Sequence, residues 1–540
     1  MTFRIERDTL GEVNVPERAY YGAQTQRAIE NFPISGLRAP EPLVTATVLV
    51  KKAAAEANVR LGRLSRRVGR AIVQAADEIL AGGLREHFVV DVYQAGAGTS
   101  HNMNANEVIA NRAAELLGGA RGDVSLVHPN DHVNMGQSTN DVFPTATRLA
   151  LLLIVPNLLR AGRALAQSLD GKSREFRRVL KTGRTHLQDA VPITLGQEFG
   201  GYAACIAVAC DALEPSIDGL RELNLGSTAV GTGINAGTDY TELAIRRLRA
   251  HTGIAVRPAE NRFRVTQSMG DVLAYSGAVR RLAVELSKVA SDLRLLSMGP
   301  RAGIAEIQLP PVQPGSSIMP GKVNPSIAEM VNQVCYQVRG CDETIAGACE
   351  AGQLELNVMM PVIAWNAIHA TTILGNAMDA LRERCVTGIR ADAERARELL
   401  DRSTAVATAL SPYMGYAATA DIAKEAVKTG RSVADLARER GLVDARKLAR
   451  ILAPEAMTTP GVPGEEKTDA KRENRTPGSG GGAARRGARG GRRQRAAADQ
   501  ARPAVSSRGS RPARGAGSRR VAEARADHGR ARDRRRRGGR

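Results

Sequence analysis

The sequence predicts a mainly α-helical protein built around a bundle of long helices. Aromatic residues make up only 3% of its 540 residues, with a single tryptophan, Trp365. Alanine, leucine, arginine and glutamate are abundant instead, and these residue types favour helices over sheets. Long segments without proline also repeat apolar residues at helical spacing. A chain of this length exceeds what one hydrophobic core usually supports, so we expect two to four domains.

Residues 1–140 are predicted to form an N-terminal domain that contributes loops to an active site. Short helical patterns alternate there with turn-rich stretches, among them Gly-Ala-Gly at 96–98 and His-Pro-Asn-Asp at 128–131. Polar loops of this kind carry function more often than cores do.

Residues 141–390 are predicted to form a central helical-bundle domain. Its candidate long helices are the segments 145–181, 195–223, 263–298 and 326–360. The segment 263–298 alone corresponds to about ten turns of helix. Helices of this length cannot all bury an apolar face within one ordinary protomer. We therefore expect the bundle to continue across the subunits of an oligomer.

Residues 391–458 are predicted to form a small C-terminal helical domain, interrupted by stops such as Gly430 and Gly441. The remaining residues, 459–540, make an arginine-, glycine- and alanine-rich tail without aromatic side chains. A segment of this composition cannot support a packed core, so we expect the tail to be disordered.

The net charge of +20 belongs to the tail rather than to the body. Residues 461–540 hold 24 Lys and Arg against 8 Asp and Glu, a net charge of +16, which leaves +4 for residues 1–460. The body is therefore not expected to bind nucleic acid through bulk charge. The tail is compatible with a genuine basic extension and with a shifted reading frame in GC-rich DNA. A genuine tail would add a second function class, an RNA-associated scaffold whose salt-sensitive binding is lost on truncation at Pro460.

The cysteines and the N-terminus predict a cytoplasmic, reduced protein. None of the six cysteines forms a C-x-x-C pair or has a histidine at zinc-finger spacing, so buried free thiols are expected. The charged N-terminus lacks the apolar core of a signal peptide. The most apolar run, 149–159, reaches only about half a membrane span and contains Pro156.

Four polar islands interrupt the predicted helices with hydroxyl, amide and glycine residues. They span residues 96–106, 134–141, 183–189 and 315–325. Taken alone, each has a structural explanation, such as an internally satisfied histidine for His186 or a helix cap for Thr99 and Asn140. Their combination on long helices predicts one shared site.

Nucleotide-binding loops are excluded as an explanation of the glycines. Residues 315–322 approach a phosphate-binding loop, but five residues separate the two glycines and Val323 stands where Ser or Thr is required. The glycine-rich stretch 226–233 follows a helical segment and lacks dinucleotide-binding spacing.

The island at 315–325, Gly-Ser-Ser-Ile-Met-Pro-Gly-Lys-Val-Asn-Pro, resembles the signature loop of the fumarase/aspartase superfamily. The resemblance runs from Arg4 to about Gly464 and includes all four islands in the expected order. It implies a three-domain subunit whose long-helix bundle joins a multi-helix core in a homotetramer, with active sites shared between subunits. It also implies an elimination that releases fumarate through a C3 carbanion stabilised by the neighbouring carboxylate.

Several motifs are more similar to aspartases, which remove ammonia from L-aspartate, than to class II fumarases, which remove water from L-malate. They are Gln-Ser-Thr-Asn-Asp at 137–141, Asn-Leu-Gly-Ser-Thr-Ala at 224–229, Asp-Leu-Arg-Leu-Leu-Ser at 292–297 and Glu-Ala-Gly-Gln-Leu-Glu-Leu-Asn-Val at 350–358. Two others, at 21–27 and 132–135, look more like fumarase. The sequence favours the ammonia-lyase and leaves fumarate hydration as the alternative.

The resemblance assigns the base and the groups that stabilise the carbanion. Ser316 would take the C3 proton, on a lid that closes over the substrate and surrounds the serine with backbone N–H groups. The carboxylate that becomes an enediolate needs hydrogen-bond donors placed in advance. These donors would be Lys322, Asn324, Ser138, Thr139 and Thr185.

The resemblance also assigns the groups around the leaving ammonium. Thr99, Asn140 and His186 would hold it, and Glu329 would pair with His186 and orient its ring. An ordinary helix-surface charge is the alternative explanation for Glu329. No cofactor and no metal are expected, because the sequence offers no cluster of metal ligands.

Overall fold

The computed structural model describes residues 2–441 and 443–465. The chain divides into two compact units, Met1–Lys467 and Thr468–Arg540, and only the first contains described residues. The expected disorder of the tail, and any nucleic-acid binding through it, therefore concern residues that lie almost entirely outside the described ones. Residues 459–465 are the exception, because they pack on the body, where the Tyr413 hydroxyl donates to the Pro463 carbonyl at 2.9 Å.

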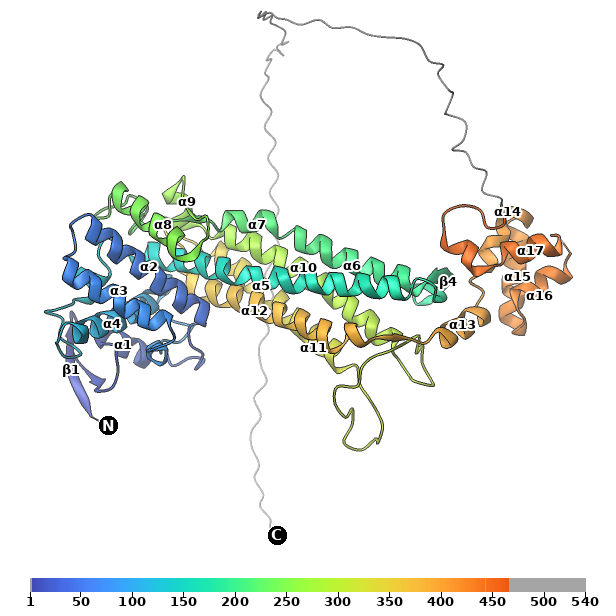
Figure 1. The fold of residues 1–540 in the computed structure, drawn as a ribbon, viewed down its shortest axis with the longest axis horizontal. Coiled ribbons are helices and arrows are strands. Elements are labelled where there is room, and N and C mark those ends of the chain that lie inside the picture. Colours follow the sequence, from blue (N-terminus) through green and yellow to red (C-terminus); the bar gives the residue numbers. More distant parts are fainter. Residues whose placement is uncertain (1, 442, 466–540) are drawn as a thin grey trace, which may run out of the picture. The chain divides into compact units, whose positions relative to one another are not determined.

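Five long helices form the central bundle. They are α5 (Thr139–Glu175), α6 (Leu195–Asp211), α10 (Gly270–Leu296), α11 (Ser326–Glu350) and α12 (Met360–Arg384). Figure 1 shows them running alongside one another, and their apolar faces share one hydrophobic core. The predicted mainly α fold with a central bundle of long helices is confirmed.

Helix α5 is the longest element and has a well-defined start. The Ser138 hydroxyl accepts from the Asn140 N–H, and the Asp141 carboxylate accepts from the Ser138 N–H, so the side chains cap the first turn. The helix continues through Pro144 and Pro156 for 37 residues, which corresponds to about 55 Å.

Helix α5 is also the one helix in the described chain that could cross a membrane by length and composition. Of its most apolar window, 72% is already buried inside the protein. Its apolar character is thus accounted for by the bundle core.

Three predicted helices are shorter than the sequence pattern suggested. Segment 263–298 breaks at residues 268–269 into α9 (Arg262–Gln267) and α10, and segment 195–223 divides into α6, α7 (Glu214–Gly219) and the short strand β5 (Glu222–Leu223). Segment 326–360 ends as a helix at Glu350. There the Asn357 side-chain amide donates to the carbonyls of Ala348 and Cys349, which the helix leaves without partners.

The N-terminal residues form a second core of their own. Its helices are α2 (Glu41–Arg60), α3 (Arg66–Leu80) and α4 (Thr99–Leu116). The preceding elements are β1 (Phe3–Asp8), β2 (Gly11–Pro16) and α1 (Ala23–Asn31), and a smaller core lies between β2 and α1. Strands β1 and β2 pair as an antiparallel hairpin, and α2 packs against both α3 and α5. Short turns of 3-10 or π helix occur at Arg85–His87, Gly96–Gly98 and Pro129–Val133.

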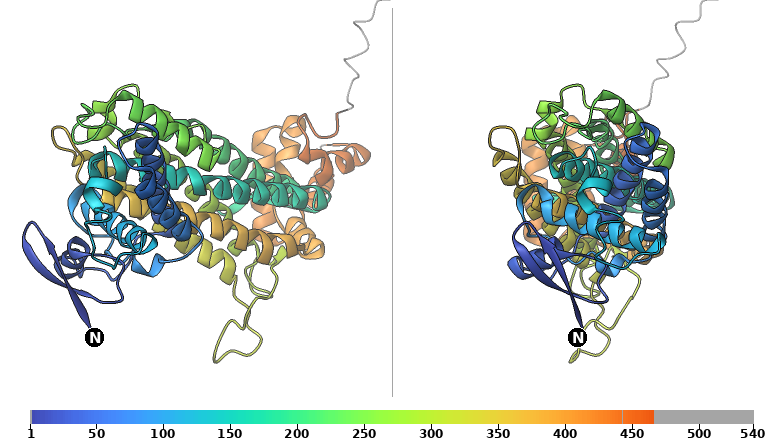
Figure 2. Two further views of the ribbon diagram at one scale, coloured as in Figure 1. Left: turned by 60° about the vertical axis from the view of Figure 1, so that its left-hand side comes forward. Right: turned by 90° about the vertical axis from the view of Figure 1, so that its left-hand side faces the viewer.

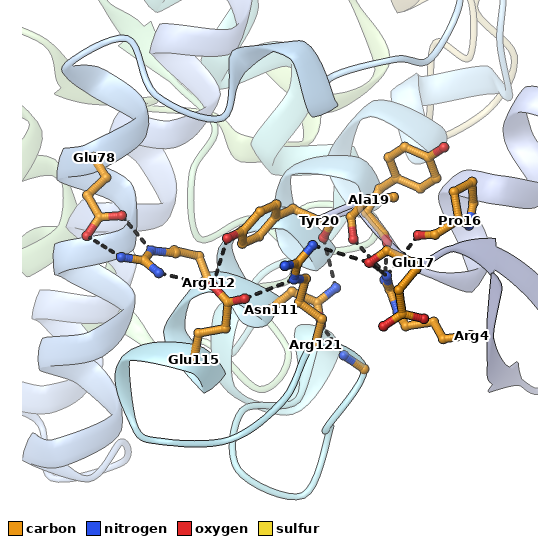
Figure 3. Close-up of polar contacts among 12 residues, drawn as sticks. Arg4, Pro16, Glu17, Ala19, Tyr20, Glu78, Asn111, Arg112, Glu115 and Arg121 are labelled. Atoms are coloured by element: carbon orange, nitrogen blue, oxygen red, sulfur yellow. Dashed lines mark hydrogen bonds and ion pairs between the residues drawn. The ribbon is translucent and has the colours of Figure 1, made fainter. Parts of the chain in front are cut away.

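A network of arginines fastens the N-terminal segment to α3 and α4, as Figure 3 shows. The Tyr20 hydroxyl donates to Glu115 of α4, and Arg112 of α4 bridges Glu115 and Glu78 of α3. The Arg4 guanidinium donates to the backbone carbonyls of Pro16, Glu17, Ala19 and Tyr21. These contacts fix helix α4, which begins at Thr99, against α3 and the N-terminal segment.

The other strands are short and occur in pairs. β3 (Leu180–Thr185) and β4 (Gln188–Thr194) form an antiparallel hairpin, β5 pairs with β6 (Arg257–Pro258), and β7 (Ile307–Gln308) pairs with β8 (Arg390–Ala391). Helix α8 (Thr238–Thr252) packs on α2. The chain between β7 and α11 leaves the bundle as a long projecting loop, visible in both Figures 1 and 2.

The last helices of the described chain surround a third core. They are α14 (Ser411–Met414), α15 (Tyr416–Thr429), α16 (Val433–Glu439) and α17 (Ala445–Ile451). Helix α13 (Ala393–Arg402) connects this group to the bundle and contacts β3.

Candidate active site

The predicted site residues fall into three groups along the bundle. Thr99, Ser138, Thr139 and Asn140 meet where α4 and α5 begin. The hairpin β3–β4, with Thr185 and His186, follows the other end of α5, which is about 55 Å from its start. The third group lies on the loop before α11 and on the first turn of that helix, and it comprises Ser316, Lys322, Asn324 and Glu329.

The loop group is also distant from the first group within one chain. The Ala97 N–H, beside Thr99, donates to the Val358 carbonyl at 2.8 Å, so the first group adjoins the chain that follows the C-terminal end of α11. The Ser316 loop precedes the N-terminal end of the same 25-residue helix, which spans about 37 Å. A single chain therefore does not assemble the predicted site.

Thr99 owes its position to the turn before it. Gly98 has a φ of +82°, and a Cβ there would lie 2.1 Å from the ring of Phe143, so only glycine allows α4 to begin so close to α5. Thr99 is exposed at the first turn of α4, and its hydroxyl donates to the Gly96 carbonyl at 3.3 Å.

The first turn of α5 presents three partly buried polar side chains. The Thr139 hydroxyl accepts from the Asn102 side-chain amide at 3.1 Å, and the Asn140 amide donates to the Ala229 carbonyl at 2.8 Å. The backbone N–H groups of a helix start carry partial positive charge, which favours a bound carboxylate. The start of α5 can therefore bind a carboxylate.

Asp141 connects this turn to a second loop. Its carboxylate is fully buried and accepts from the backbone N–H groups of Gly226 and Thr228 at 2.9 and 3.0 Å. Burial raises the pKa of Asp141 to about 6, and the hydrogen bonds from the backbone oppose the rise. The glycine-rich stretch 226–233 thus supports the first turn of α5.

His186 lies at the tip of a tight turn. Thr185 pairs with Gln188, so His186 and Leu187 form a two-residue connection, with φ values of +55° and +59°. Glycine and asparagine usually fill such positions, because other side chains are strained there. The turn holds both side chains exposed.

A buried ion network that the sequence did not indicate joins the hairpin to the base of the Ser316 loop. Glu306 is 0% exposed and pairs with Arg184 at 2.9 Å and with Lys181 at 3.2 Å. Lys181 also pairs with Glu198 at 3.0 Å. Arg184 is two residues from His186, and Glu306 directly precedes β7, which leads into the loop.

Ser316 is held by its own loop. Its hydroxyl oxygen accepts from the backbone N–H groups of Ile318 and Met319 at 3.2 and 3.0 Å. Two N–H donors aimed at one oxygen favour the serine oxyanion over the neutral hydroxyl.

The rest of the loop closes on itself around Gly315. The Gly315 N–H donates to the Lys322 carbonyl at 2.8 Å, and the Asn324 amide donates to the Gly315 carbonyl at 2.8 Å. A Cβ at position 315 would lie 2.4 Å from the Lys322 carbonyl oxygen, so the turn requires glycine. Lys322 itself is exposed.

Glu329 lies in the first turn of α11, partly buried. No hydrogen bond joins it to His186 among the residues that the structure describes. The expected pairing of the two side chains within one site therefore stays a prediction about neighbouring subunits.

Two protein families match the chain. The family described as Lyase matches residues 11–340, and the family described as Fumarase C C-terminus matches residues 406–459. The first match alone covers more than half of the chain.

Individual proteins match over the same region. The aspartate ammonia-lyase of Pseudomonas aeruginosa is 51% identical over 462 residues, 85% of this chain and 97% of that protein. The class II fumarate hydratase of Mesorhizobium japonicum is 46% identical over 459 residues, 85% of this chain and 99% of that protein. The crystal structure of a fumarate lyase:delta crystallin from Brucella melitensis is 52% identical, covers 85% of this chain and 100% of that one, and has a TM-score of 0.81.

Proposed function

This chain belongs to the fumarase/aspartase superfamily of lyases, and we propose that its reaction is the reversible elimination of ammonia from L-aspartate to give fumarate. The chain is then a carbon–nitrogen lyase. The observation that carries the proposal is its identity to an aspartate ammonia-lyase over almost the full length of that enzyme, above its identity to a fumarate hydratase. The aspartase-like motif at 350–358 supports the same branch.

The reaction requires hydrogen-bond donors and a positive charge that stabilise a developing dianion. Removal of the C3 proton places a second negative charge on the neighbouring carboxylate, and only donors already in position can stabilise it without reorganisation. Lys322 supplies a point charge and Asn324 a neutral donor from the loop. The start of α5 supplies Ser138 and Thr139, and the hairpin supplies Thr185.

Ser316 acts as the base in this proposal. A serine hydroxyl is a poor base in water, and the two N–H groups that reach its oxygen lower the cost of forming the oxyanion. Movement of the whole loop toward the substrate would exclude water and strengthen these bonds.

The leaving ammonium is held by Thr99, Asn140 and His186. A hydroxyl, an amide oxygen and a neutral imidazole nitrogen can all accept from N–H, so the set fits an amine. In this scheme Glu329 accepts from the other ring nitrogen of His186 and fixes the ring orientation.

We further propose that the active species is a homotetramer whose sites draw residues from several subunits. The position of the first group supports this, because the lengths of α5 and α11 separate it by tens of ångströms from the hairpin and from the Ser316 loop within one chain. The expected domain boundaries near residues 140, 390 and 458 and a cytoplasmic location are part of the same proposal. The six free cysteines are compatible with a reducing compartment.

An assay of the purified protein tests the function directly. Fumarate formation is followed by absorbance with L-aspartate and, in parallel, with L-malate as the substrate. We expect kcat/KM for L-aspartate to exceed that for L-malate by at least about 100-fold, since sites built to bind a polar group reject analogues that lack it. The opposite preference would establish the fumarate hydratase instead.

A further inference from the structure

A fully buried lysine lies beneath the first turn of α5. Lys51, in the middle of α2, is 0% exposed, and its ammonium group donates to the side-chain oxygens of Asn134 at 2.8 Å and Gln137 at 2.9 Å. Burying an amine is costly unless its hydrogen bonds are satisfied. Two amide oxygens at this distance show that the site is built to receive it.

Lys51 fixes which way both amides face. Amide oxygens only accept, so each must turn its oxygen toward the amine. Burial lowers the pKa of Lys51 to about 7, and either protonation state of the amine has the two N–H bonds that these oxygens need. The NH₂ groups then point away, from Asn134 to the Gln137 carbonyl and from Gln137 to the Val133 carbonyl.

The orientation of the Asn134 amide, which Lys51 fixes, in turn fixes the orientation of the Asn102 amide. The Asn134 oxygen also accepts from the Asn102 side chain at 3.3 Å, which obliges Asn102 to present its NH₂ group. The same NH₂ group donates to the Thr139 hydroxyl at 3.1 Å. The Asn102 oxygen is left buried without a hydrogen-bond partner among the described residues. The Asn102 oxygen therefore has no partner that would select this orientation. The hydrogen bond to the Asn134 oxygen selects it.

Thr139 is the end of the chain of hydrogen bonds. A hydroxyl has one hydrogen, and a hydroxyl that accepts from Asn102 keeps that hydrogen for another partner. In the described part of the protein Thr139 takes part in no other side-chain hydrogen bond. Its O–H is thus free to donate, and a substrate carboxylate can only accept.

We propose that Lys51 and Asn102 are positioning residues that fix the hydrogen-bond direction at Thr139, so that its hydroxyl donates to a carboxylate of the substrate. The proposal rests on the proposed function only in taking a dicarboxylate as the substrate. Asp141 and His101 are the other titratable groups that face Lys51, and neither lies in this chain of hydrogen bonds.

A double-mutant cycle tests the proposal. Asn102→Asp replaces the NH₂ donor by an acceptor of the same shape, so the Thr139 hydrogen turns inward. We expect kcat/KM for L-aspartate to fall about 10- to 100-fold, the worth of a hydrogen bond to a charged group. We expect the dissociation constant of succinate, a dicarboxylate without an amine, to rise by a similar factor. In the Thr139→Val background the same substitution should change both values less than about twofold.

Equal losses in the wild-type and Thr139→Val backgrounds would overturn the proposal, since the introduced carboxylate would then act by its charge or through the fold. Lys51→Met is the second variant, because it removes the donor at the start of the chain without adding a charge. It too should weaken succinate binding in the wild-type background and not in the Thr139→Val background, and equal weakening in both would again overturn the proposal. If L-malate proves to be the substrate, the cycle is run with L-malate, so failure of the proposed function is distinguished from failure of this inference.

Discussion

The surroundings of single residues set the chemistry that each can perform. Ser316 and Ser138 illustrate the contrast, because both hydroxyls accept backbone N–H bonds. Ser138 caps the 37-residue helix α5, whereas the N–H groups at Ser316 belong to the projecting loop before α11 and start no helix. The Ser316 contacts therefore stabilise the oxygen itself rather than a helix end.

Replacement of Ser316 by alanine should abolish elimination while it leaves the fold intact. The loop keeps its Gly315–Lys322 and Asn324–Gly315 hydrogen bonds and loses only the Ser316 hydroxyl with the two N–H bonds that it accepts. We expect kcat to fall roughly 10²- to 10⁴-fold, the usual worth of general-base catalysis. Turnover is measured together with far-UV circular dichroism and tetramer mass. A variant that keeps more than about a tenth of wild-type turnover would remove Ser316 from this role.

His101 makes stability depend on pH. It is 1% exposed, and burial lowers its pKa from the ordinary value of 6.5 to about 4, with a smaller contribution from Lys51. The Thr47 hydroxyl donates to the Leu43 carbonyl and lies 2.9 Å from His101 Nε2. The imidazole nitrogen is therefore the donor to Thr47, and the folded protein holds His101 neutral.

The unfolded chain binds a proton at this position between pH 6.5 and pH 4, where the folded protein does not. The free energy of unfolding is thus unaffected by His101 above pH 6.5. It falls as the pH approaches 4, with about 2 kcal/mol lost at pH 5. His101→Gln keeps an N–H donor for Thr47 and has no such proton. Unfolding midpoints at pH 7.5 and pH 5 should therefore differ less for the variant than for the wild type. Asp141, whose raised pKa acts in the opposite direction, is common to both proteins. Equal pH dependence in the two proteins would refute this role for His101.

Sequence patterns identify individual polar residues only where they interrupt an apolar context. Thr99 and Thr139 stood out because they lie in islands of hydroxyl and amide residues. Lys51 was missed because a lysine in an alanine-rich helix is usually a solvated charge, and its burial depends on the packing of α2 against α5. Glu306 was missed for the same reason, since its partners Lys181 and Arg184 are more than 120 residues earlier in the sequence.

At the scale of elements, the helices were predictable and their ends were not. Apolar periodicity located four of the five bundle helices, because it reflects a face that must be buried, whereas α12 (Met360–Arg384) was not among the predicted segments. The predicted segment continued to residue 360, although α11 ends at Glu350. Its end depends on the Asn357 side chain, which periodicity does not register. The turn at His186 was equally invisible, because it contains neither glycine nor asparagine.

The hairpin β3–β4 and the base of the Ser316 loop should loosen together when Glu306 is replaced by glutamine. The carboxylate faces both Arg184 and Lys181 while fully buried, and loss of one partner from a buried ion pair costs about 3 kcal/mol. We expect faster amide exchange in residues 180–194 and 303–310, a lower thermal midpoint and a lower kcat/KM.

Glu198→Gln is the matched control for Glu306→Gln. Glu198 has one cationic partner, Lys181, and its side chain is 21% exposed, so its loss should cost less. If Glu306→Gln left amide exchange in both segments unchanged, or affected it no more than Glu198→Gln does, the network would not join the two elements.

At the scale of the whole molecule, the family resemblance and the described body end within a few residues of each other. The Tyr413–Pro463 hydrogen bond is the last side-chain hydrogen bond that joins the C-terminal segment to the body in the described chain. Truncation after Gly464 should preserve turnover, thermal midpoint and tetramer mass, because the residues removed are poor in large apolar side chains. Truncation after Thr459, which also removes Pro463, should lower the midpoint. If truncation after Gly464 lowered the thermal midpoint by several degrees, the tail would have to pack on the body.

The proposed division of the site among subunits can be tested directly. Asn140 lies at the start of α5 and Ser316 on the loop before α11, at opposite ends of the bundle of one chain. Protein carrying Asn140→Ala and protein carrying Ser316→Ala are prepared separately, and each is first shown to be impaired at least about 100-fold. The two are then mixed, dissociated and allowed to reassociate, with hybrid tetramers verified by native mass spectrometry.

If one site takes Asn140 from one subunit and Ser316 from another, random hybrids restore intact sites. Each of the two contributing subunits is the required one about half of the time, so activity should approach about a quarter of the wild-type value per site. If both residues of a site came from the same chain, every site would keep one lesion and no activity would return. Hybrid tetramers without recovered turnover would therefore contradict the shared site. Such a result would mean that a rearrangement brings the two ends of the bundle together within one chain, and the close packing of α5 and α11 opposes that movement.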